Sequence, residues 1–291
     1  SIAIMLIAAV MSLTGHGINY GIDFAGGLNL QYNMGAAYDK ADVEEALKAQ
    51  GIEEFVVSSV GSDGTTVQIR VPTLSSEDEV QNLQNGLESA LLEKYPDMDT
   101  DNATASYVGP VAGATLVRNA VFSVLIAAAL MLIYIAFRFD LFSGIAAVVG
   151  LLHDVLIMIS FMVILRSVIQ MNSSFIAAML TIVGYSINNT IVIFDRIREN
   201  NKKPALAGQP RSEIVELSVK ESLGRTINTT LTTLVTIVTL YILGVASIRE
   251  FSLPIIIGIL AGAYSANLIN GYVWAALEDA RLARKSQKKA A

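Results

Sequence analysis

Three polar side chains interrupt an apolar stretch between residues 175 and 200, and they are the first candidates for chemistry. Asn188 and Asn189 lie three and four residues after Tyr185, so a helix would place all three on one face. Polar groups at membrane depth are costly, and they are usually buried inside a helix bundle and often functional. We therefore take this face as the candidate site.

A second polar pair, His153 and Asp154, lies near the middle of another apolar run. A charged Asp at the centre of a membrane costs roughly 2.5–3.5 kcal/mol on insertion scales, which implies a partner, access to water or a neutral state. We favour a role in a proton relay. The alternative, a structural pair whose members satisfy each other, stays open.

Composition decides which class of protein positions these residues. Of the 291 residues 53% are hydrophobic and only 16% are charged, and the mean hydropathy is positive, which indicates a polytopic membrane protein. The chain has no Cys, which excludes disulfides, thiolate metal sites and thiol nucleophiles. A net charge of −6 argues against nucleic-acid binding. No HExxH, paired aspartates or nucleophile motif is present, so we do not expect an enzyme.

Six apolar runs predict six transmembrane helices. The first, residues 1–14, is short, and residue 1 is not Met, so we expect the chain to be a trimmed or cut piece of a longer polypeptide. The other five are each long enough to cross a hydrocarbon core of roughly 30 Å. They cover about residues 115–137, 142–165, 173–194, 226–247 and 253–274, all within the segment 113–276.

Residues 15–112 have the character of a folded domain between the first two spans. Period-2 patterns predict strands at about 28–32, 55–60, 66–71 and 103–108. Asp39 is predicted to cap an amphipathic helix that runs to about Gln50, and Ser75 or Ser76 to start a second helix that runs to about Lys94. The order βαββαβ is the ferredoxin-like pattern, an α+β fold. The domain is acidic and shows no catalytic dyad, so we expect it to bind a partner through its surface.

Basic residues predict the orientation. Most lie in one short turn at Arg138, in the loop 195–223 and in the tail 277–291, which all fall on the cytoplasmic side if both termini are inside. The domain 15–112 is then extracytoplasmic. Within the loop, residues 211–223 are read either as a helix at the membrane interface or as a solvated connector. The tail is expected to be frayed and to touch anionic membrane lipid.

Several motifs, taken in order along nearly the whole chain, resemble those of the SecF family. They are GIDFAGG at 21–27, HDV at 153–155, GYSINNT at 184–190 continuing into FDRIREN, and GRTINTT at 224–230. The resemblance implies one half of a transporter of the RND superfamily in the bacterial inner or plasma membrane. It also implies SecD as a partner, separate or fused, together with the SecYEG translocon and the translocating preprotein. Protons would be the coupling ion, with no cofactor, and their flow would move the outer domains that pull the secreted chain.

The chain departs from the family at Asn189, where the family has an Asp that is its inferred proton carrier. A carboxylic acid in a low-dielectric bundle has a raised pKa and can load and release a proton near neutral pH, whereas an amide cannot. We interpret Asn189 as a deliberate replacement of aspartate, with a natural variant as the alternative. Arg225 resembles the family's functional arginine. It either tunes a carboxylate at position 189 or extends to the interface as an anchor.

The segment GIDFAGG also needs a structural interpretation. Gly26 and Gly27 permit backbone conformations forbidden to other residues. Together with Gly21 and Asp23 they predict a tight structural junction into the first strand. A phosphate loop is excluded, because no strand precedes the motif and no helix with Lys-Ser/Thr follows it.

Two other classes of function stay open. A proton-driven small-molecule exporter of RND type would share the six-span half and the polar fourth span, but it would normally have larger outer domains. A non-transporting scaffold subunit would keep the fold and need no titratable relay. The behaviour of Asn189→Asp in a test of protein export distinguishes them.

Overall fold

The computed structural model describes residues 1–60, 64–72, 74, 76–167 and 169–290. Contacts divide the chain into two compact units, each considered by itself. The first, the helical unit, contains Ser1–Asn19, Val121–Ile169 and the chain from Ser174 onward. The second, the sheet unit, contains Tyr20–Ala120 together with Gln170–Ser173.

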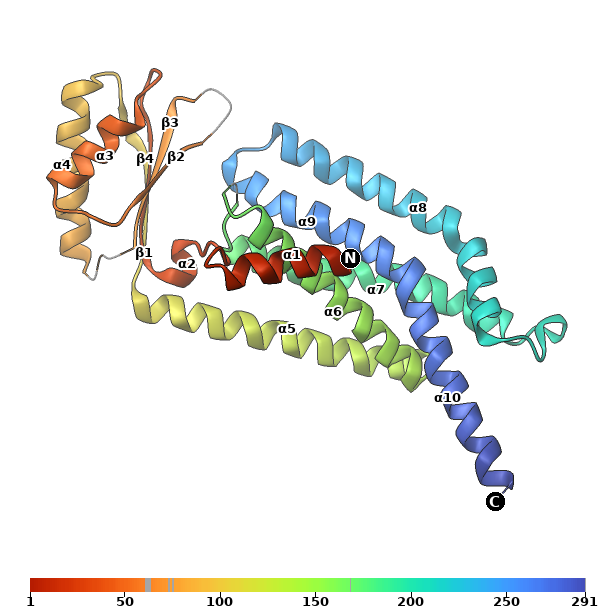
Figure 1. Ribbon diagram of the computed structural model, residues 1–291. Coiled ribbons are helices and arrows are strands. Elements are labelled where there is room, and N and C mark those ends of the chain that lie inside the picture. The colour runs from red at the N-terminus through yellow and green to blue at the C-terminus, as the bar shows by residue number, and fades with distance from the viewer. Residues whose placement is uncertain (61–63, 73, 75, 168, 291) are drawn as a thin grey trace. The chain divides into compact units, whose positions relative to one another are not determined.

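The sheet unit is built on four antiparallel strands in the order β2-β3-β1-β4. The central strand β1 pairs Leu30 with Ile69 of β3 on one side and with Ala105 of β4 on the other. Figure 1 shows the two longer helices, α3 and α4, on one face of this sheet. The elements are α2 (Ile22–Ala25), β1 (Gly27–Asn33), α3 (Lys40–Ala49), β2 (Val56–Val60), β3 (Thr66–Val71), α4 (Glu77–Lys94) and β4 (Asp99–Val108).

Alternation along the strands explains the core of this unit. Leu28, Leu30 and Tyr32 of β1 are buried together with apolar residues of β3, α3 and α4. Side-chain caps fix where the helices begin, as the sequence predicts. The Asp39 carboxylate accepts from the Ala41 backbone N–H at 3.0 Å, and Ser76 Oγ accepts from the Glu79 N–H at 3.3 Å. Residue 75 lies outside the described residues.

The helical unit holds most of the membrane-length helices. Its elements are α1 (Ile2–Leu13), the greater part of α5 (Pro110–Arg138), α6 (Leu141–Ile164), α7 (Ser173–Asn200) beyond its first residue, η1 (Pro204–Leu206), α8 (Arg211–Leu243), α9 (Ala246–Ser265), η2 (Ala266–Asn270) and α10 (Gly271–Ala290). Among the described residues, five helical stretches are long and apolar enough to cross a membrane. The helix α1 has 12 residues, about 18 Å at 1.5 Å per residue, so a count of six spans stays a prediction.

Residues 211–223 are helical, as the first of the two interpretations predicts, and the solvated connector is wrong. They form the first part of the continuous helix α8 and not a separate helix. Ile214, Val215 and Ser218 are buried, and Asn200 Nδ2 at the end of α7 donates to Ser218 Oγ at 3.0 Å. The apolar face of this segment therefore packs on protein. The connecting loop shortens to residues 201–210 because α7 extends to Asn200.

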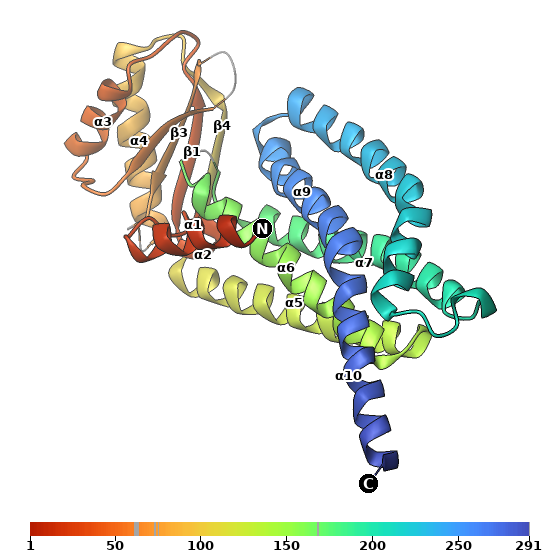
Figure 2. The ribbon, with the colours of Figure 1, turned by 45° about the vertical axis from the view of Figure 1, so that its right-hand side comes forward.

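The prediction that the tail is frayed is also wrong. Helix α10 begins at Gly271 and continues through Ala290. The stretch after Trp274 is rich in Ala, Leu, Glu, Arg and Lys, which are strong helix formers, so charge alone did not predict disorder there. Figure 2 shows α9 continuing into α10 along one course of helix.

Candidate functional site

The carboxylate of Asp154 is the centre of a buried polar cluster in the helical unit. Asp154 lies on α6 with no exposed surface. Its Oδ2 accepts from Ser186 Oγ of α7 at 2.6 Å and from Ser265 Oγ of α9 at 2.9 Å, while its Oδ1 lies 2.9 Å from His153 Nδ1. One carboxyl group thus links three helices, and these hydrogen bonds explain how a polar group is accommodated among apolar side chains.

Small residues allow these helices to approach closely. On the face of α6 that carries Asp154, Ala146, Ala147 and Gly150 are all buried. A Cβ built on Gly150 would overlap the side-chain oxygen of Asn270. Small residues at helix contacts are typical of packing in membranes, where close backbone approach replaces the hydrophobic driving force. The cluster therefore depends on the absence of a side chain at position 150.

Helix α7 contributes one polar face to the cluster. Ser186, Asn189 and Thr190 are spaced i, i+3 and i+4 and are all buried, with exposed fractions of 2%, 1% and 1%. Ser186 donates to Asp154, and Thr190 Oγ1 accepts from Asn270 Nδ2 at 2.8 Å. Asn189 lies on this same face, and its Nδ2 has no hydrogen-bond partner within the described parts of the chain.

The π-helical turn η2 brings polar residues of the last helix to its neighbours. Ser265 contacts Asp154, Asn270 contacts Thr190, and Asn267 Oδ1 accepts from Thr226 Oγ1 of α8 at 3.3 Å. Residues five apart in an α-helix lie on faces about 140° apart. A wider π turn reduces this angle, so Ser265 and Asn270 both point into the bundle. Single π turns are often found at functional sites.

The structure places one of the predicted site residues, Asn188, on a different face from Asn189. Asn188 is exposed and faces away from the cluster, so the prediction of one shared face for Tyr185, Asn188 and Asn189 is wrong. Successive residues of a helix are 100° apart around its axis. The buried face of α7 is the one that carries Ser186, Asn189 and Thr190. Tyr185 is half-buried, and its hydroxyl is enclosed without a partner among the described residues.

Arg225 does not reach the cluster in this chain. It lies on α8 with an exposed side chain, and it forms no ion pair with any described residue. Its neighbour Thr226 faces inward and is 1% exposed. Because Thr226 is buried and the adjacent Arg225 is exposed, the face of α8 that packs toward α9 and η2 carries Thr226 and not Arg225.

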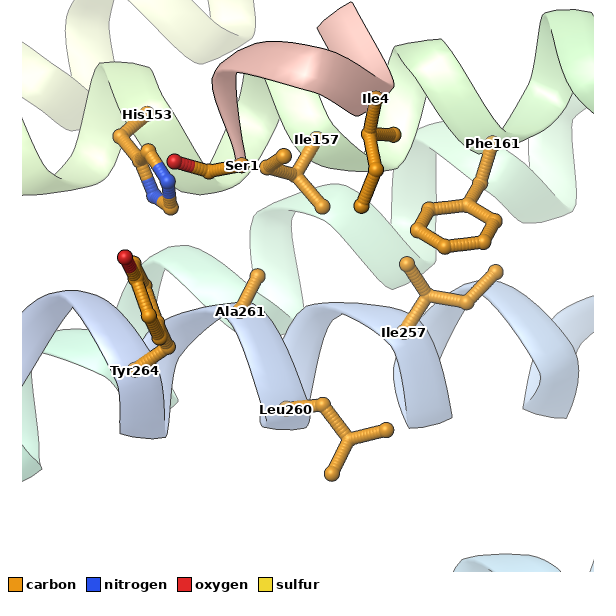
Figure 3. A pocket seen from close by; sticks show the side chains of 9 residues that line it. All are labelled: Ser1, Ile4, His153, Ile157, Phe161, Ile257, Leu260, Ala261 and Tyr264. Atoms are coloured by element: carbon orange, nitrogen blue, oxygen red, sulfur yellow. The ribbon is translucent and has the colours of Figure 1, made fainter.

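His153 borders an apolar pocket of about 350 Å³ between α1, α6 and α9. Figure 3 shows His153 and Tyr264 facing each other at one end of this pocket, with Phe161 and Ile257 at the other. The two rings stack with centroids 5.7 Å apart. His153 therefore connects the Asp154 carboxylate to the edge of the bundle.

Sequence reasoning missed part of this cluster. Ser265 gave no signal, because a lone Ser in an apolar helix usually bonds to its own backbone. Asn267 and Asn270, three residues apart in an apolar run, have the spacing of polar residues that join neighbouring membrane helices, and the hydrogen bond from Asn270 to Thr190 is a contact of that kind. Ser265 and Asn270 face the same side of the bundle only because the turn η2 is π-helical. The residue types in 266–270 do not predict a π turn.

The close packing at position 150 gives a first prediction. Gly150→Ala is expected to lower the free energy of unfolding by about 1–3 kcal/mol, because the added methyl must displace Asn270. The matched control is Gly184→Ala on α7, where a Cβ meets nothing within 4 Å. Thermal unfolding of the purified protein should show loss in the first variant and a neutral or stabilising effect in the second. Equal melting temperatures would refute the packing argument.

The predicted junction residues lie in the sheet unit, away from the Asp154 cluster along the chain. Asp23 is in the short helix α2, Gly21 caps that helix, and Gly26 and Gly27 lead from it into β1. Gly26 and Gly27 have φ values of 77° and 113°, conformations that favour glycine.

Comparison with known proteins identifies the family. The family model described as protein export membrane protein SecD/SecF, C-terminal, matches residues 88–280, and the SecD/SecF GG motif matches residues 12–34. Protein translocase subunit SecF of Rickettsia bellii is 35% identical over 252 residues, which is 87% of this chain and 81% of that protein. The SecF of Alicyclobacillus acidocaldarius is 35% identical over 98% of this chain and 89% of its own length.

Solved structures agree with these matches. The crystal structure of SecDF from Thermus thermophilus, a translocon-associated membrane protein, superposes with a TM-score of 0.77 at 35% identity over 96% of this chain. SecDF in a super-membrane-facing form gives a TM-score of 0.66 at 32% identity over 99% of this chain. The chain spans 37% and 38% of those two longer proteins. With its apolar helices it is a multi-pass membrane protein, and it belongs to the SecD/SecF family of protein export membrane proteins, among the SecF subunits.

Proposed function

We propose that this chain is an accessory subunit of the Sec export machinery that works with SecD, on the same or a separate polypeptide. In this proposal the proton gradient drives movements of the sheet unit that pull preproteins emerging from SecYEG across the membrane. The observation that carries the proposal is the fully buried Asp154 carboxylate, which accepts hydrogen bonds from Ser186 of α7 and Ser265 of α9. Ser186 lies on the same buried face of α7 as position 189. The subunit has no catalytic role, and protons are its coupling ion.

Position 189 is the proposed site of proton loading. Its side chain is 1% exposed, three residues from Ser186 on the same helix face. An aspartate there would place a second carboxyl group on the buried face of α7 that also carries Ser186, the residue that donates to Asp154. Asparagine has nearly the same shape and cannot titrate. We infer that Asn189 holds the site in the state that resembles the protonated acid.

The free energy released when protons cross the membrane is large enough to drive a conformational change. One elementary charge crossing the membrane potential releases roughly 2.3 kcal/mol per 100 mV. Two conformations of a hinged protein differ by a few kcal/mol. One or a few protons per cycle therefore suffice to shift the population of such a hinge.

Sidedness and span number are part of the proposal. The basic residues favour a cytoplasmic C-terminus and an extracytoplasmic sheet unit. The element order β1-α3-β2-β3-α4-β4 and the strand order β2-β3-β1-β4 support a ferredoxin-like fold for that unit. We also propose α1 as part of a sixth span, because it packs on α6 and its apolar side chains, such as Leu6 and Val10, are exposed.

Arg225 is proposed to act on position 189 only when an acid stands there. In the Asn189→Asp background, Arg225→Met is expected to abolish proton coupling, because an opposite charge near the carboxylate adjusts when it releases its proton. Proton-dependent export in membrane vesicles measures this effect. Lys220→Met, in an ion pair on the exposed surface of α8, is the matched control. Full activity of the Arg225 variant would reduce the arginine to an anchor.

A scaffold subunit is the second candidate function, because Asn189 itself cannot titrate. The deciding experiment reconstitutes the chain with SecD and the translocon in vesicles and compares Asn189 with Asn189→Asp. Stimulation of export by a proton gradient only in the aspartate variant supports the motor. Equal export in both variants at every gradient supports the scaffold. Proton-driven efflux of a small molecule without effect on export would point to an exporter.

A further inference from the structure

The four residues that precede most of α7 belong to the sheet unit. Gln170–Ser173 cluster with Tyr20–Ala120 although they are far away in sequence. Tyr20 and Met171 form an isolated parallel bridge, and the Gly21 N–H donates to the Met171 carbonyl at 2.9 Å. The start of GIDFAGG therefore lies along the segment that leads into α7.

Asp23 adds a side-chain contact to this backbone pairing. Its Oδ2 accepts from the backbone N–H of Ser173, the first residue of α7, at 2.7 Å. The first N–H groups of a helix have no partner inside the helix, and a carboxylate is favoured there by the helix dipole. The first turn of α7 contains no acidic residue of its own. A residue 150 positions earlier in the chain thus supplies the carboxylate.

Glycines make the short helix α2 fit tightly around this contact. A Cβ at Gly21 would lie 3.1 Å from the Asn172 Cβ, and one at Gly113 would lie 2.9 Å from the Phe24 carbonyl oxygen. At Gly27, where β1 begins, a Cβ would overlap the Val71 carbonyl. Close packing before, beside and after α2 therefore leaves this short helix little freedom to shift relative to Ser173.

We propose that Asp23 is a positioning residue that caps α7 from outside the helix and clamps its first turn to the start of β1. The clamp consists of Asp23 with Gly21 on one side and Met171 with Ser173 on the other. Position 189 lies 16 residues further along the same helix, about 24 Å at 1.5 Å per residue. This use of the clamp rests on the proposed function. A movement of α7 along its axis would be transmitted to β1 through Asp23 and the four residues that follow it, up to Gly27.

The cap is tested without any assay of export. Amide hydrogen exchange of the solubilised full chain is followed by mass spectrometry in peptides covering residues 171–178. Asp23→Ala is expected to speed exchange there about fivefold, the effect of losing one side-chain cap. Asp23→Asn, which keeps an acceptor, should stay close to the parent. Asp101→Ala, at an exposed acid of the same unit, is the control. Unchanged exchange in Asp23→Ala would overturn the proposal.

A cysteine pair then distinguishes positioning from proton transfer. The chain has no Cys, so Asp23→Cys with Ser173→Cys introduces a single disulfide-forming pair. In the Asn189→Asp background, export is expected to be low when the pair is reduced and restored when it is oxidised, since the covalent bond replaces the cap. Failure to form the disulfide, or inactivity in both states, would overturn the clamp. If Asn189→Asp alone shows no proton-dependent export, the proposed function fails, and the exchange result still decides the cap.

Discussion

Replacing Asn189 by aspartate is expected to raise proton-gradient-dependent export by at least about tenfold. One proton crossing about 100 mV supplies roughly 2.3 kcal/mol, which corresponds to a factor of about 50 in an equilibrium between two conformations. The amide at position 189 cannot use this energy, because it never changes charge. The aspartate variant can, since its side chain would share the buried face of Ser186 and Thr190.

The control for this result is the same change at the next residue. Asn188→Asp adds one carboxylate to α7 at a position that is exposed and outside the cluster. It is expected to leave export independent of the proton gradient. Export is measured in inverted vesicles that contain SecD and the translocon, with and without an uncoupler. Strong proton conduction or coupled export by the chain that carries Asn189 would refute the assignment of the carrier to this position.

The contrast between Asn188 and Asn189 shows what the sequence could and could not predict. Spacing placed both on one side of a helix together with Tyr185, because residues three and four apart are neighbours. The buried face of α7 is narrower than the face that spacing alone defines. Packing against α6 and α9 decides which of the two adjacent amide side chains is buried. The contacts of Asp154 have the same origin, because they come from α7 and α9, residues 32 and 111 positions away.

Local signals performed better in the sheet unit. Period-2 alternation predicted Thr66–Val71 at its observed bounds, and the Asp39 cap is confirmed. These features depend on neighbours within a few residues. The sequence did not predict that residues 211–223 and the fifth span form one continuous helix, or that the tail is helical, because the charges in both places were interpreted as signs of a boundary. The short helix α2 was missed because four residues between glycines carry no periodicity.

Asp154→Asn is expected to separate the charge of the cluster from its structure. If the amide oxygen replaces Oδ2, it still accepts from Ser186 and Ser265, and its NH₂ group can donate to His153 Nδ1. All three contacts then survive without a titratable group. In the Asn189→Asp background, proton-dependent export should fall at least about tenfold, while the melting temperature stays within a few degrees of the parent.

Asp154→Leu removes the acceptor as well as the charge. Ser186 then loses its partner on α6, whereas Ser265 keeps its bond to the Gly262 carbonyl at 3.2 Å. A buried hydroxyl without a partner costs about 1–3 kcal/mol, so this variant should lose both stability and coupling. Asp195→Asn is the control, since Asp195 is exposed and its ion pair with Arg138 contributes little.

The two Asp154 variants together decide between the interpretations of the His153–Asp154 pair. A relay requires that Asp154→Asn fold normally and fail to couple, because only the ability to change charge has been removed. A structural pair requires that Asp154→Asn retain coupling and that only Asp154→Leu show a defect. The measurements are thermal unfolding and export as a function of the imposed pH gradient. Since Ser186 of α7 and Ser265 of α9 both donate to Oδ2 of Asp154, a substitution at this one residue reaches two helix contacts at once, and only the pair of variants separates the loss of charge from the loss of the acceptor.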